Sequence, residues 1–219
     1  MLNYPFAAVL FDLDGVVIDT TALHYRVWKE FAKRHGHVPS QIELVATNGR
    51  RAAETIRNWL GRELGDAEVE ALTFERETQF NRALAVEPVD AVPGVREFIV
   101  SLTRRGVPIA VVTSAIPANA DLSLARVGLA GRFDAMVSSA DVRKGKPDPE
   151  CYLNAAQLLG VKANRCVVIE DSISGIQAAK AAGTRCAALT TTFPRDVLEM
   201  ENPDWLSNDF RDLALELRV

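Results

Sequence analysis

The sequence predicts an α/β fold: a doubly wound, mainly parallel sheet with a small all-helical insertion after its first strand. Apolar runs of strand length, without the polar alternation of half-exposed strands, alternate with helical patterns from about residue 90 onward. The stretch from about 19 to 89 shows helical patterns and no convincing strand. We therefore expect one core formed by residues 1–18 and 90–219, interrupted by a helical domain over residues 19–89.

The first expected strand is an apolar run that begins at Phe6 and ends at Asp12. A second carboxylate, Asp14, and a glycine, Gly15, follow directly. Charged groups do not remain unpaired in a core, so both aspartates should lie where the strand leaves the sheet. Ligands of open α/β sheets bind at that carboxyl end.

Three helices are expected within the insertion. The first carries an apolar stripe at helical spacing that includes Leu23, Val27 and Phe31, and Gly36 follows as its stop signal. The three helices are expected at about residues 21–35, 51–60 and 66–84.

Helices and strands alternate after Pro93. Glycines follow several of the helical segments, and Asp148 with Pro149 has the form of an N-cap followed by a first-turn proline. The expected strands lie at about 107–113, 135–138, 166–169 and 185–189. The expected helices lie at about 93–106, 119–127, 148–160 and 172–182, and a surface helix is expected at 209–217.

Composition excludes several classes of protein. The chain has 219 residues, 48% of them hydrophobic, and a formal net charge of −4, which argues against a sequence-independent nucleic-acid surface. No apolar run approaches the roughly 20 residues that span a bilayer, and no signal peptide is expected. The three cysteines show no CxxC spacing, so we expect free buried thiols and a reducing, cytoplasmic location.

Polar groups follow four of the expected strands or the loops after them, and parallel strands would bring these groups to one crevice. Carboxylates gathered there repel each other by about 4 kcal/mol per pair at 4 Å with an effective dielectric of 20. A hard cation such as Mg²⁺ relieves that repulsion, while lysine, hydroxyl groups and helix N-termini suit a phosphate. The pattern predicts Mg²⁺-assisted phosphoryl transfer, with Lys144 and Lys146 as competing lysines. The groups are Asp12 and Asp14, Thr113 and Ser114, Lys144 and Lys146, and Glu170 and Asp171.

These groups also resemble the four motifs of the haloacid dehalogenase superfamily, in order. Within it, residues 111–114, 145–149 and 170–179 resemble the β-phosphoglucomutase-like and sugar- or polyol-phosphate phosphatase group. The insertion resembles the small helical cap of that family. The four motifs read Asp12-Leu13-Asp14-Gly15, Val112-Thr113-Ser114, Lys146-Pro147 and Glu170-Asp171-Ser172.

The resemblance implies a role for each core residue. Asp12 would be the nucleophile that forms an aspartyl-phosphate, and Asp14 would be the general acid and then the general base. Thr113 and Lys146 would hold the transferring phosphoryl group, and the resemblance favours Lys146 over Lys144. Mg²⁺ would be held by Asp12, by Asp171 and by the backbone carbonyl of Asp14, with Glu170 as a possible further ligand.

Substrate specificity is expected in the cap. Thr20, His24, Arg50, Arg51 and the core residue Ser114 are candidate substrate- or phosphate-binding residues, although His24 and the arginines could equally be solvated surface groups.

The expected function is a Mg²⁺-dependent phosphatase of a small sugar or polyol phosphate, acting as a monomer or weak homodimer. A sugar phosphomutase is the alternative, but the cap Lys and Arg of such mutases are replaced here by Asn48 and Ala52. A hydrolytic dehalogenase is disfavoured because Asp14 and Asp171 would have no role. A non-catalytic binding protein is disfavoured by the intact motif set.

Overall fold

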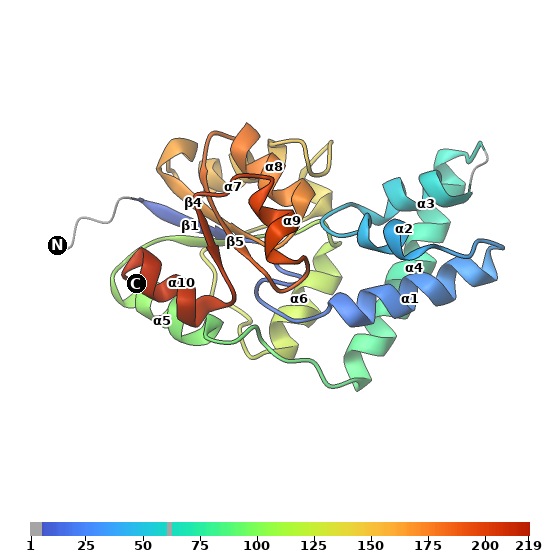
Figure 1. The fold of residues 1–219 in the computed structure, drawn as a ribbon. Helices are drawn as coiled ribbons and strands as arrows, with labels where there is room; N and C mark the ends of the chain where they lie inside the picture. The colour runs from blue at the N-terminus through green and yellow to red at the C-terminus, as the bar shows by residue number, and fades with distance from the viewer. Residues whose placement is uncertain (1–5, 61–62) are drawn as a thin grey trace.

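The protein is built on a six-stranded parallel sheet with the strand order β3-β2-β1-β4-β5-β6 (Figure 1). The computed structural model describes residues 6–60 and 63–219. The sheet and its order confirm the predicted doubly wound α/β fold, and every pairing is parallel. The strands are β1 (Ala8–Phe11), β2 (Ile109–Val112), β3 (Ala135–Val137), β4 (Cys166–Glu170), β5 (Arg185–Leu189) and β6 (Trp205–Ser207).

Strand β1 lies in the middle of the sheet, where the strand order changes direction. Phe11, its last residue, is in register with Val111 of β2 and Ile169 of β4. The carboxyl ends of these three strands are therefore level, and the residues that follow them meet at one edge. Such a reversal of strand order is where open α/β sheets bind ligands.

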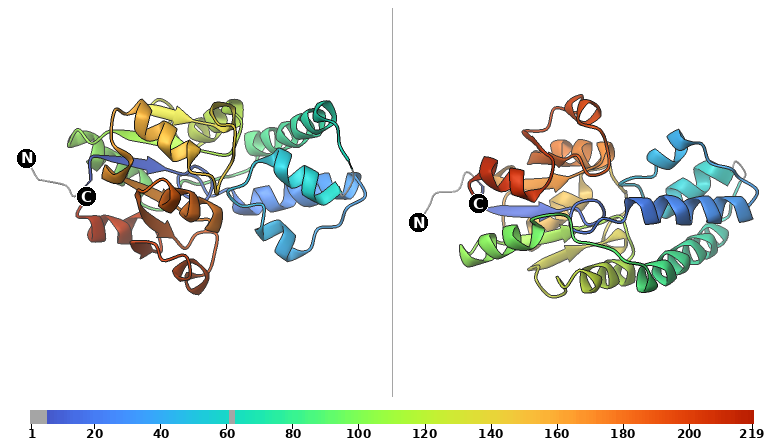
Figure 2. Two further views of the ribbon diagram at one scale, coloured as in Figure 1. Left: turned by 90° about the horizontal axis from the view of Figure 1, so that it is seen from above. Right: turned by 60° about the horizontal axis from the view of Figure 1, so that its bottom comes forward.

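Ten α-helices lie within the described residues, and those of the core cover both faces of the sheet (Figure 2). None of the helices in these described ranges is both long and apolar enough to cross a membrane. The helices are α1 (Thr21–Arg34), α2 (Gln41–Val45), α3 (Ala52–Leu60), α4 (Asp66–Val86), α5 (Val95–Arg104), α6 (Pro117–Arg126), α7 (Glu150–Leu158), α8 (Ile173–Ala181), α9 (Arg195–Glu199) and α10 (Phe210–Leu217).

Side chains of β1 alternate between two hydrophobic clusters, one on each face of the sheet. Val9 and Phe11 pack with residues of α5, α6 and α10. Ala8 and Leu10 pack with residues of α7, α8 and α9. A strand that is buried on both faces needs apolar residues at every position, which explains its unbroken apolar run.

Helices α1 to α4 form the insertion that follows β1, and no strand falls within residues 19–60 or 63–89. Its own hydrophobic cluster includes Trp28, Phe31 and Leu72. Residues of α1 and α4 such as Val27 and Phe80 join the core cluster, so the insertion also packs on the sheet domain. The predicted boundaries at residues 18/19 and 89/90 stay a prediction.

The two chain connections between the core and the insertion run side by side. Ile18 and Ala91 form an antiparallel bridge, and the Asp19 N–H donates to the Asp90 carbonyl at 2.9 Å. Figures 1 and 2 show the insertion at the end of the molecule opposite the C-terminus. The two ends of the insertion are therefore tied to each other beside the carboxyl edge of the sheet.

Three short elements were not predicted: α2, α9 and β6. Helix α2 has five residues and depends on a capping box between Ser40 and Glu43 rather than on an apolar stripe. The surface helix expected at 209–217 is present as α10, which buries Phe210, Leu213 and Leu217 in the core cluster and exposes its other face. The predicted N-cap of α7 was one residue early: Pro149 is the N-cap and Glu150 the first helical residue, although the Asp148 side chain does accept from the Glu150 N–H at 3.1 Å.

The cysteines match their prediction. Cys151, Cys166 and Cys186 are all free and buried. Each belongs to the cluster between the sheet and helices α7, α8 and α9, where a thiol packs as a small apolar group.

Candidate active site

Asp12 is the first residue after the central strand, and it lies at the middle of the carboxyl edge. Its backbone N–H still donates to the Ile169 carbonyl of β4 at 2.9 Å, which fixes the backbone beside the sheet. The residue is only 6% exposed, and its side chain contacts the ammonium group of Lys146. A buried carboxylate with one open side towards a cavity suits a nucleophile that must meet its substrate away from water.

Lys146 is held against Asp12 by Glu170. The Lys146 ammonium donates to Glu170 Oε1 at 2.6 Å, and the Tyr152 hydroxyl donates to the same oxygen at 2.6 Å. Glu170 Oε2 accepts from the backbone N–H groups of Asp171 and Ser172, both at 3.0 Å. Burial alone would lower the pKa of Lys146, but the two carboxylates hold that pKa above its ordinary value.

Three buried carboxylates form a group that could hold a metal ion. Oxygen atoms of Asp12, Glu170 and Asp171 lie within 4.8 Å of one another. Burial, opposed in part by Lys146, raises the pKa of Asp12 to about 8, and burial with the charges of Glu170 and Asp12 raises the pKa of Asp171 well above its ordinary value.

Burial is the main cause of the raised pKa values, and a charge imbalance adds to it, since the single ammonium of Lys146 faces three carboxylates. A divalent cation would balance the remaining two negative charges, and all-oxygen ligands suit Mg²⁺. The residues therefore fit the ion. The oxygens of Glu170 already accept the hydrogen bonds described above, so Asp12 and Asp171 are the carboxylates that remain available. The Asp14 carboxylate lies outside this group, and the part expected of its backbone carbonyl stays a prediction.

Gly15 keeps space open beside the acidic group. A Cβ atom at this position would lie 1.9 Å from Asp171 Oδ2, and the backbone has a φ of +78°. Thr192 donates to the same Asp171 oxygen and lies 2.9 Å from the Thr21 hydroxyl at the start of α1. The glycine of the first motif is therefore required by both its conformation and its neighbour.

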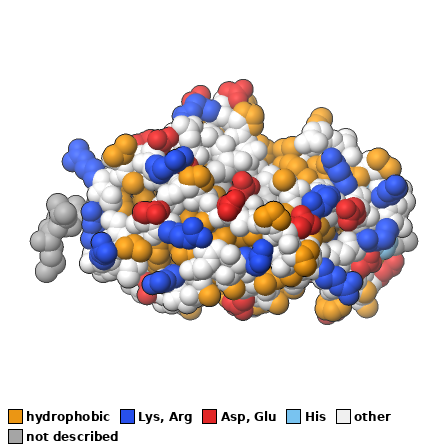
Figure 3. All heavy atoms as spheres, turned by 90° about the horizontal axis from the view of Figure 1, so that it is seen from below, with side chains coloured by type: hydrophobic (Ala, Val, Ile, Leu, Met, Phe, Trp, Pro, Cys, Tyr) orange, Lys and Arg blue, Asp and Glu red, His pale blue; other side chains and the backbone are white. Residues whose placement is uncertain are grey.

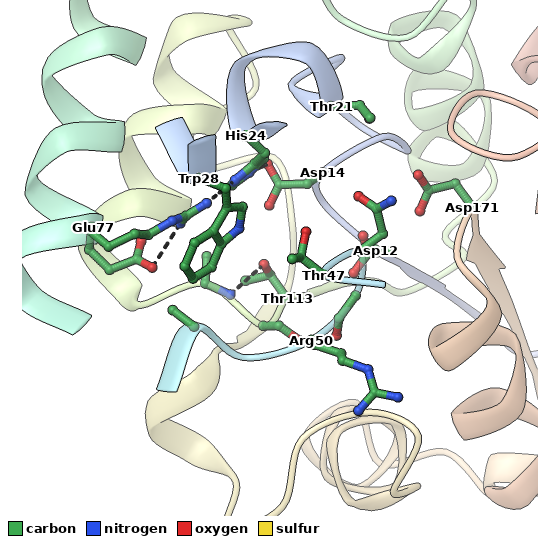
Figure 4. A pocket seen from close by; sticks show the side chains of 16 residues that line it. Asp12, Asp14, Thr21, His24, Trp28, Thr47, Arg50, Glu77, Thr113 and Asp171 are labelled. Atoms are coloured by element: carbon green, nitrogen blue, oxygen red, sulfur yellow. Dashed lines mark hydrogen bonds and ion pairs between the residues drawn. The ribbon is translucent and has the colours of Figure 1, made fainter. Parts of the chain in front are cut away.

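Asp14 points to the opposite side of the cavity from Asp171 and towards the insertion (Figure 4). Its Oδ1 accepts from the Thr20 hydroxyl at 2.6 Å and lies 3.1 Å from His24 Nε2. Burial raises the pKa of Asp14, but the charge and hydrogen bonds of its neighbours, His24 first and then Thr20 and Arg76, outweigh it and lower the pKa below its ordinary value.

The hydrogen-bonding roles of the two His24 ring nitrogens follow from a second partner, Arg76. Arg76 Nη2 lies 2.5 Å from His24 Nδ1, and a guanidinium can only donate. Nδ1 must therefore accept, and the ring proton lies on Nε2, where it is donated to Asp14. His24 thus links the Asp14 carboxylate of the core to the Arg76 guanidinium of α4.

Thr113 and Ser114 follow β2, on the side of Asp12 away from β4. Thr113 is 4% exposed, and its hydroxyl accepts from the Ala115 N–H at 3.0 Å. The Ser114 hydroxyl donates to the Gly49 carbonyl of the insertion at 2.7 Å. Thr113 is thus fixed within the core, while Ser114 joins the core to the loop between α2 and α3.

The cavity lies between the sheet edge and the insertion and encloses about 70 Å³. Figure 4 shows residues of α1, the loop after α2 and α4 facing the core residues across it. Its lining consists of Asp12, Asp14, Thr21, His24, Trp28, Thr47, Asn48, Gly49, Arg50, Ala52, Arg76, Glu77, Thr113, Ser114, Ala115 and Asp171.

Most of the predicted site residues come together around this cavity. Lys146 and Glu170 lie directly behind Asp12, and Thr20 lies behind Asp14. Arg51 is outside the lining, and its Nη1 donates to the Arg143 carbonyl at 2.9 Å. The residues that line the cavity as predicted are Asp12, Asp14, His24, Arg50, Thr113, Ser114 and Asp171.

Two of the competing or uncertain side chains have clear positions. Lys144 is exposed and lies 3.8 Å from Asp148, so the geometry favours Lys146 as the lysine of the site. The guanidinium of Arg50 points away from the carboxylates in Figure 4.

Sequence reasoning missed Trp28, Arg76 and Glu77. Arg76 and Glu77 look like ordinary charges of a helix surface, yet both are only 4% exposed. Arg76 falls in the register of the apolar stripe that includes Leu72 and Phe80, four residues before and after it. A charge inside an apolar stripe was the signal that could have identified this pair.

Comparisons with known proteins agree with this geometry. The family model described as haloacid dehalogenase-like hydrolase matches residues 6–183. Hexitol phosphatase A of Escherichia coli (strain K12) is 30% identical, over 94% of this chain and 92% of its own. Fructose-1-phosphate phosphatase YqaB of the same organism is 35% identical over 81% of this chain and 93% of its own.

A mutase and a solved hydrolase are also similar. Beta-phosphoglucomutase of Bacillus subtilis (strain 168) is 30% identical over 96% of this chain and 92% of its own. The crystal structure of a HAD hydrolase, family IA, variant 3, from Entamoeba histolytica HM-1:IMSS is 29% identical, with a TM-score of 0.86 over 96% of both chains. The family match covers most of this chain, and the motif residues meet at one cavity: the protein belongs to the haloacid dehalogenase-like hydrolases.

Proposed function

We propose that this protein is a Mg²⁺-dependent phosphatase that hydrolyses a small sugar- or polyol-phosphate monoester through an aspartyl-phosphate. One observation carries the proposal. Asp12 follows the central strand, contacts Lys146 and forms an acidic group with Glu170 and Asp171, and Asp14 faces the same cavity. A phosphoryl group in the cavity would then meet a nucleophile, a proton donor and fixed positive charge.

In the first step the Asp12 carboxylate attacks phosphorus, and the bond from phosphorus to the alcohol oxygen breaks. Asp14 gives its proton to that oxygen, so the alcohol leaves neutral. Because the pKa of Asp14 is lowered, its protonated form is disfavoured in the free protein. The negative charge of a bound phosphate acts in the opposite direction and favours the protonated form of Asp14.

In the second step a water molecule attacks the phosphorus of the aspartyl-phosphate. Asp14, now ionised, takes the water proton, inorganic phosphate leaves, and the Asp12 carboxylate is restored. Lys146 and Thr113 are positioned to neutralise and orient the phosphoryl oxygens in both steps. Asp12 and Asp171, with Glu170 and the Asp14 carbonyl as further candidates, would hold Mg²⁺, which when bound offsets the negative charge shared by the carboxylates and the phosphoryl group.

The proposed substrate class rests on the insertion and on the relatives. The cavity wall opposite the carboxylates is polar, with Asn48, Arg76 and Glu77 among its residues. Two relatives are named as phosphatases of a hexitol phosphate and of fructose 1-phosphate. A small phosphorylated polyol or sugar is therefore the substrate that we propose for this chain.

A sugar phosphomutase is the second candidate, because one relative of similar identity is named beta-phosphoglucomutase. A mutase must hold a second phosphate at the cap. The positions at which we expected the cap cations of such mutases are Asn48 and Ala52. The phosphatase is therefore the better supported of the two.

Phosphate release from a panel of sugar and polyol phosphates, with Mg²⁺ and with EDTA, tests the proposal. We expect Mg²⁺-dependent release that Asp12→Asn abolishes and that Asp14→Ala lowers by at least roughly 100-fold. Asp121→Asn, on the exposed surface of α6, is the matched control and should keep full activity. Full turnover in EDTA or in Asp12→Asn would disprove the proposal.

The same panel separates the two candidates. A mutase would convert glucose 1-phosphate only with a sugar bisphosphate primer and would release little free phosphate. Such a result would show that the protein is a sugar phosphomutase and not a phosphatase.

A further inference from the structure

Glu77 is a buried carboxylate that lines the cavity and has no part in the proposed steps. It lies on α4, its side chain is nearly inaccessible, and it belongs to the insertion rather than to the sheet. Its Oε1 accepts from Arg76 Nη1 at 2.9 Å, and its Oε2 accepts from Asn119 Nδ2 of the core helix α6. A carboxylate is costly to bury, so its place in the wall of an active-site cavity calls for a function.

The position of Glu77 matches the part of the substrate that is not phosphorylated. Figure 4 shows Glu77 at the end of the cavity opposite Asp12 and Asp171, with Trp28 between them. A phosphate that meets Asp12 would direct its alcohol portion towards the insertion. The groups around Glu77 therefore face the leaving alcohol and not the phosphoryl group.

Hydrogen bonding around Glu77 is incomplete. Arg76 Nε and Asn119 Oδ1 are buried, and neither has a hydrogen-bond partner among the residues that the structure describes. Buried polar atoms are normally paired with protein, water or a ligand. Each oxygen of Glu77 can also accept a further hydrogen bond. Asn119 lies outside the cavity lining, but within the lining Glu77 offers acceptors and Arg76 a donor, and a hydroxyl group satisfies both because it donates and accepts.

The charge of the cluster disfavours a second phosphate. Arg76 is paired with Glu77, and its guanidinium lies 4.4 Å from the centre of the Trp28 ring. Of the two arginines that line the cavity, Arg76 is therefore already paired with a carboxylate, and the Arg50 guanidinium extends away from Glu77 in Figure 4. A second phosphate would meet the Glu77 carboxylate without a cation to balance both anions.

We propose that Glu77 is a specificity-determining residue: it accepts hydrogen bonds from hydroxyl groups of the leaving alcohol and excludes substrates with a second phosphate. This inference rests on the proposed phosphatase function and deepens it. The favoured substrate is a monophosphate whose distal part is neutral and hydroxylated.

The test compares three phosphate compounds in the holoenzyme with Mg²⁺: sorbitol 6-phosphate, acetyl phosphate and fructose 1,6-bisphosphate. The ratio of kcat/KM for sorbitol 6-phosphate to that for acetyl phosphate measures the use of hydroxyl groups. In Glu77→Gln we expect this ratio to fall about 10- to 100-fold, mainly through KM, the scale of a lost hydrogen bond to a charged group. We expect the discrimination against the bisphosphate to weaken as well.

Two further variants make the result specific. Glu77→Asp keeps the charge but withdraws the carboxylate, so it should lower the hydroxyl ratio while still rejecting the bisphosphate. If Glu77→Gln does not fold, the kcat/KM ratio measured in Glu77→Asp still tests the inference. Glu75→Gln, two positions away on α4 and paired with Arg34 outside the cavity, should leave all three compounds unchanged.

The outcomes separate this inference from the proposed function. An equal loss with sorbitol 6-phosphate and acetyl phosphate would mean that Glu77 is only structural, and it would overturn the inference. An unchanged ratio in both Glu77 variants would overturn it too. Failure of the unchanged protein to release phosphate from any compound would instead refute the phosphatase function itself.

Discussion

A single side chain, His24, connects the proton-transfer residue of the core to the charges of the insertion. It donates to Asp14 from Nε2 and accepts from Arg76 at Nδ1, and its ring stacks on Phe80 with centroids 4.1 Å apart. The stacking and the two hydrogen bonds together leave the imidazole one orientation. The ionised form of Asp14 is stabilised as a result.

Replacing His24 should therefore shift the acid limb of the pH profile. In His24→Ala the Asp14 carboxylate loses a donor, so its pKa rises and the ionised form appears only at higher pH. Because the second step needs ionised Asp14, the acid limb of kcat should move to higher pH. Steady-state rates between pH 4 and 8 measure this, and His37→Ala, outside the cavity, is the control. An acid limb at the same pH in both variants would contradict the interpretation.

Which residues could be predicted depended on their immediate neighbours in the chain. Asp12 and Asp14 were identified because they end a buried apolar run, and unpaired charges do not remain in a core. For Glu77 the only signal in the sequence was its neighbour Arg76 inside an apolar stripe, and its contact with Asn119 is known only once α4 and α6 are packed together. Arg51 was expected at the substrate, but its side chain lies against Gly145 outside the cavity, and no sequence pattern distinguishes the two positions.

The loop between α2 and α3 is the element that closes the cavity. Its carbonyl groups accept from two core hydroxyls: Ser114 donates to Gly49 at 2.7 Å, and Ser174 donates to Asn48 at 3.1 Å. The enclosed volume of about 70 Å³ is far below the roughly 300–1000 Å³ of ligand pockets. We infer that a sugar phosphate enters when these contacts break and the insertion moves about its two connections to the core.

Removing one of these hydrogen bonds should favour the open arrangement. A hydrogen bond contributes about 0.5–1.5 kcal/mol, so Ser174→Ala should make opening roughly 2- to 10-fold more frequent. Hydrogen exchange of the amide groups of residues 47–50, measured by mass spectrometry, should accelerate by the same factor. Ser101→Ala on α5 is the control. Equal exchange in the two variants would show that the loop does not open by breaking this contact.

Elements with a full apolar stripe or a doubly buried run were predictable, whereas short ones were not. Helix α1 and strand β4 bury several side chains each, so their periodicity is visible in the chain. Strand β6 has three residues, and Trp205 and Leu206 are only partly buried at the sheet edge. Its pairing with β5 depends on tertiary contacts, and a segment of three residues is too short to show a strand pattern in the sequence.

At the scale of the whole molecule, the site destabilises the metal-free protein as pH rises. Asp12 has a pKa of about 8 in the folded protein against an ordinary value of 3.8, so between these values the folded state holds a proton that the unfolded chain has lost. Stability then falls with rising pH in this range. A cation that binds the ionised carboxylates would remove this penalty.

The melting temperature should respond to Mg²⁺ accordingly. We expect the increase caused by saturating Mg²⁺ to be larger at pH 8 than at pH 6, because at pH 6 the ion must displace protons. Differential scanning calorimetry with and without Mg²⁺ measures both values. Asp12→Asn removes the titrating group, so the difference between the two pH values should shrink. A larger increase at pH 6 would contradict the assigned site.

On the face that Figure 3 shows, charged side chains of one sign do not gather together as the buried carboxylates of the site do. Lys and Arg side chains are scattered among Asp and Glu side chains there. On that face the charge is mixed, whereas the three buried carboxylates that face one ammonium lie beneath the insertion.

The bridge between Ile18 and Ala91 has a consequence for how such a molecule can change over evolutionary time. Because the two ends of the insertion are hydrogen-bonded to each other, the chain leaves and re-enters the sheet domain at one place, and the insertion is a closed loop. Lengthening a closed loop costs only about 0.6 kcal/mol for each doubling. Whole helices can therefore be gained, lost or exchanged at this point while Asp12 and Asp14 keep their places, so new substrates can be acquired without rebuilding the chemistry.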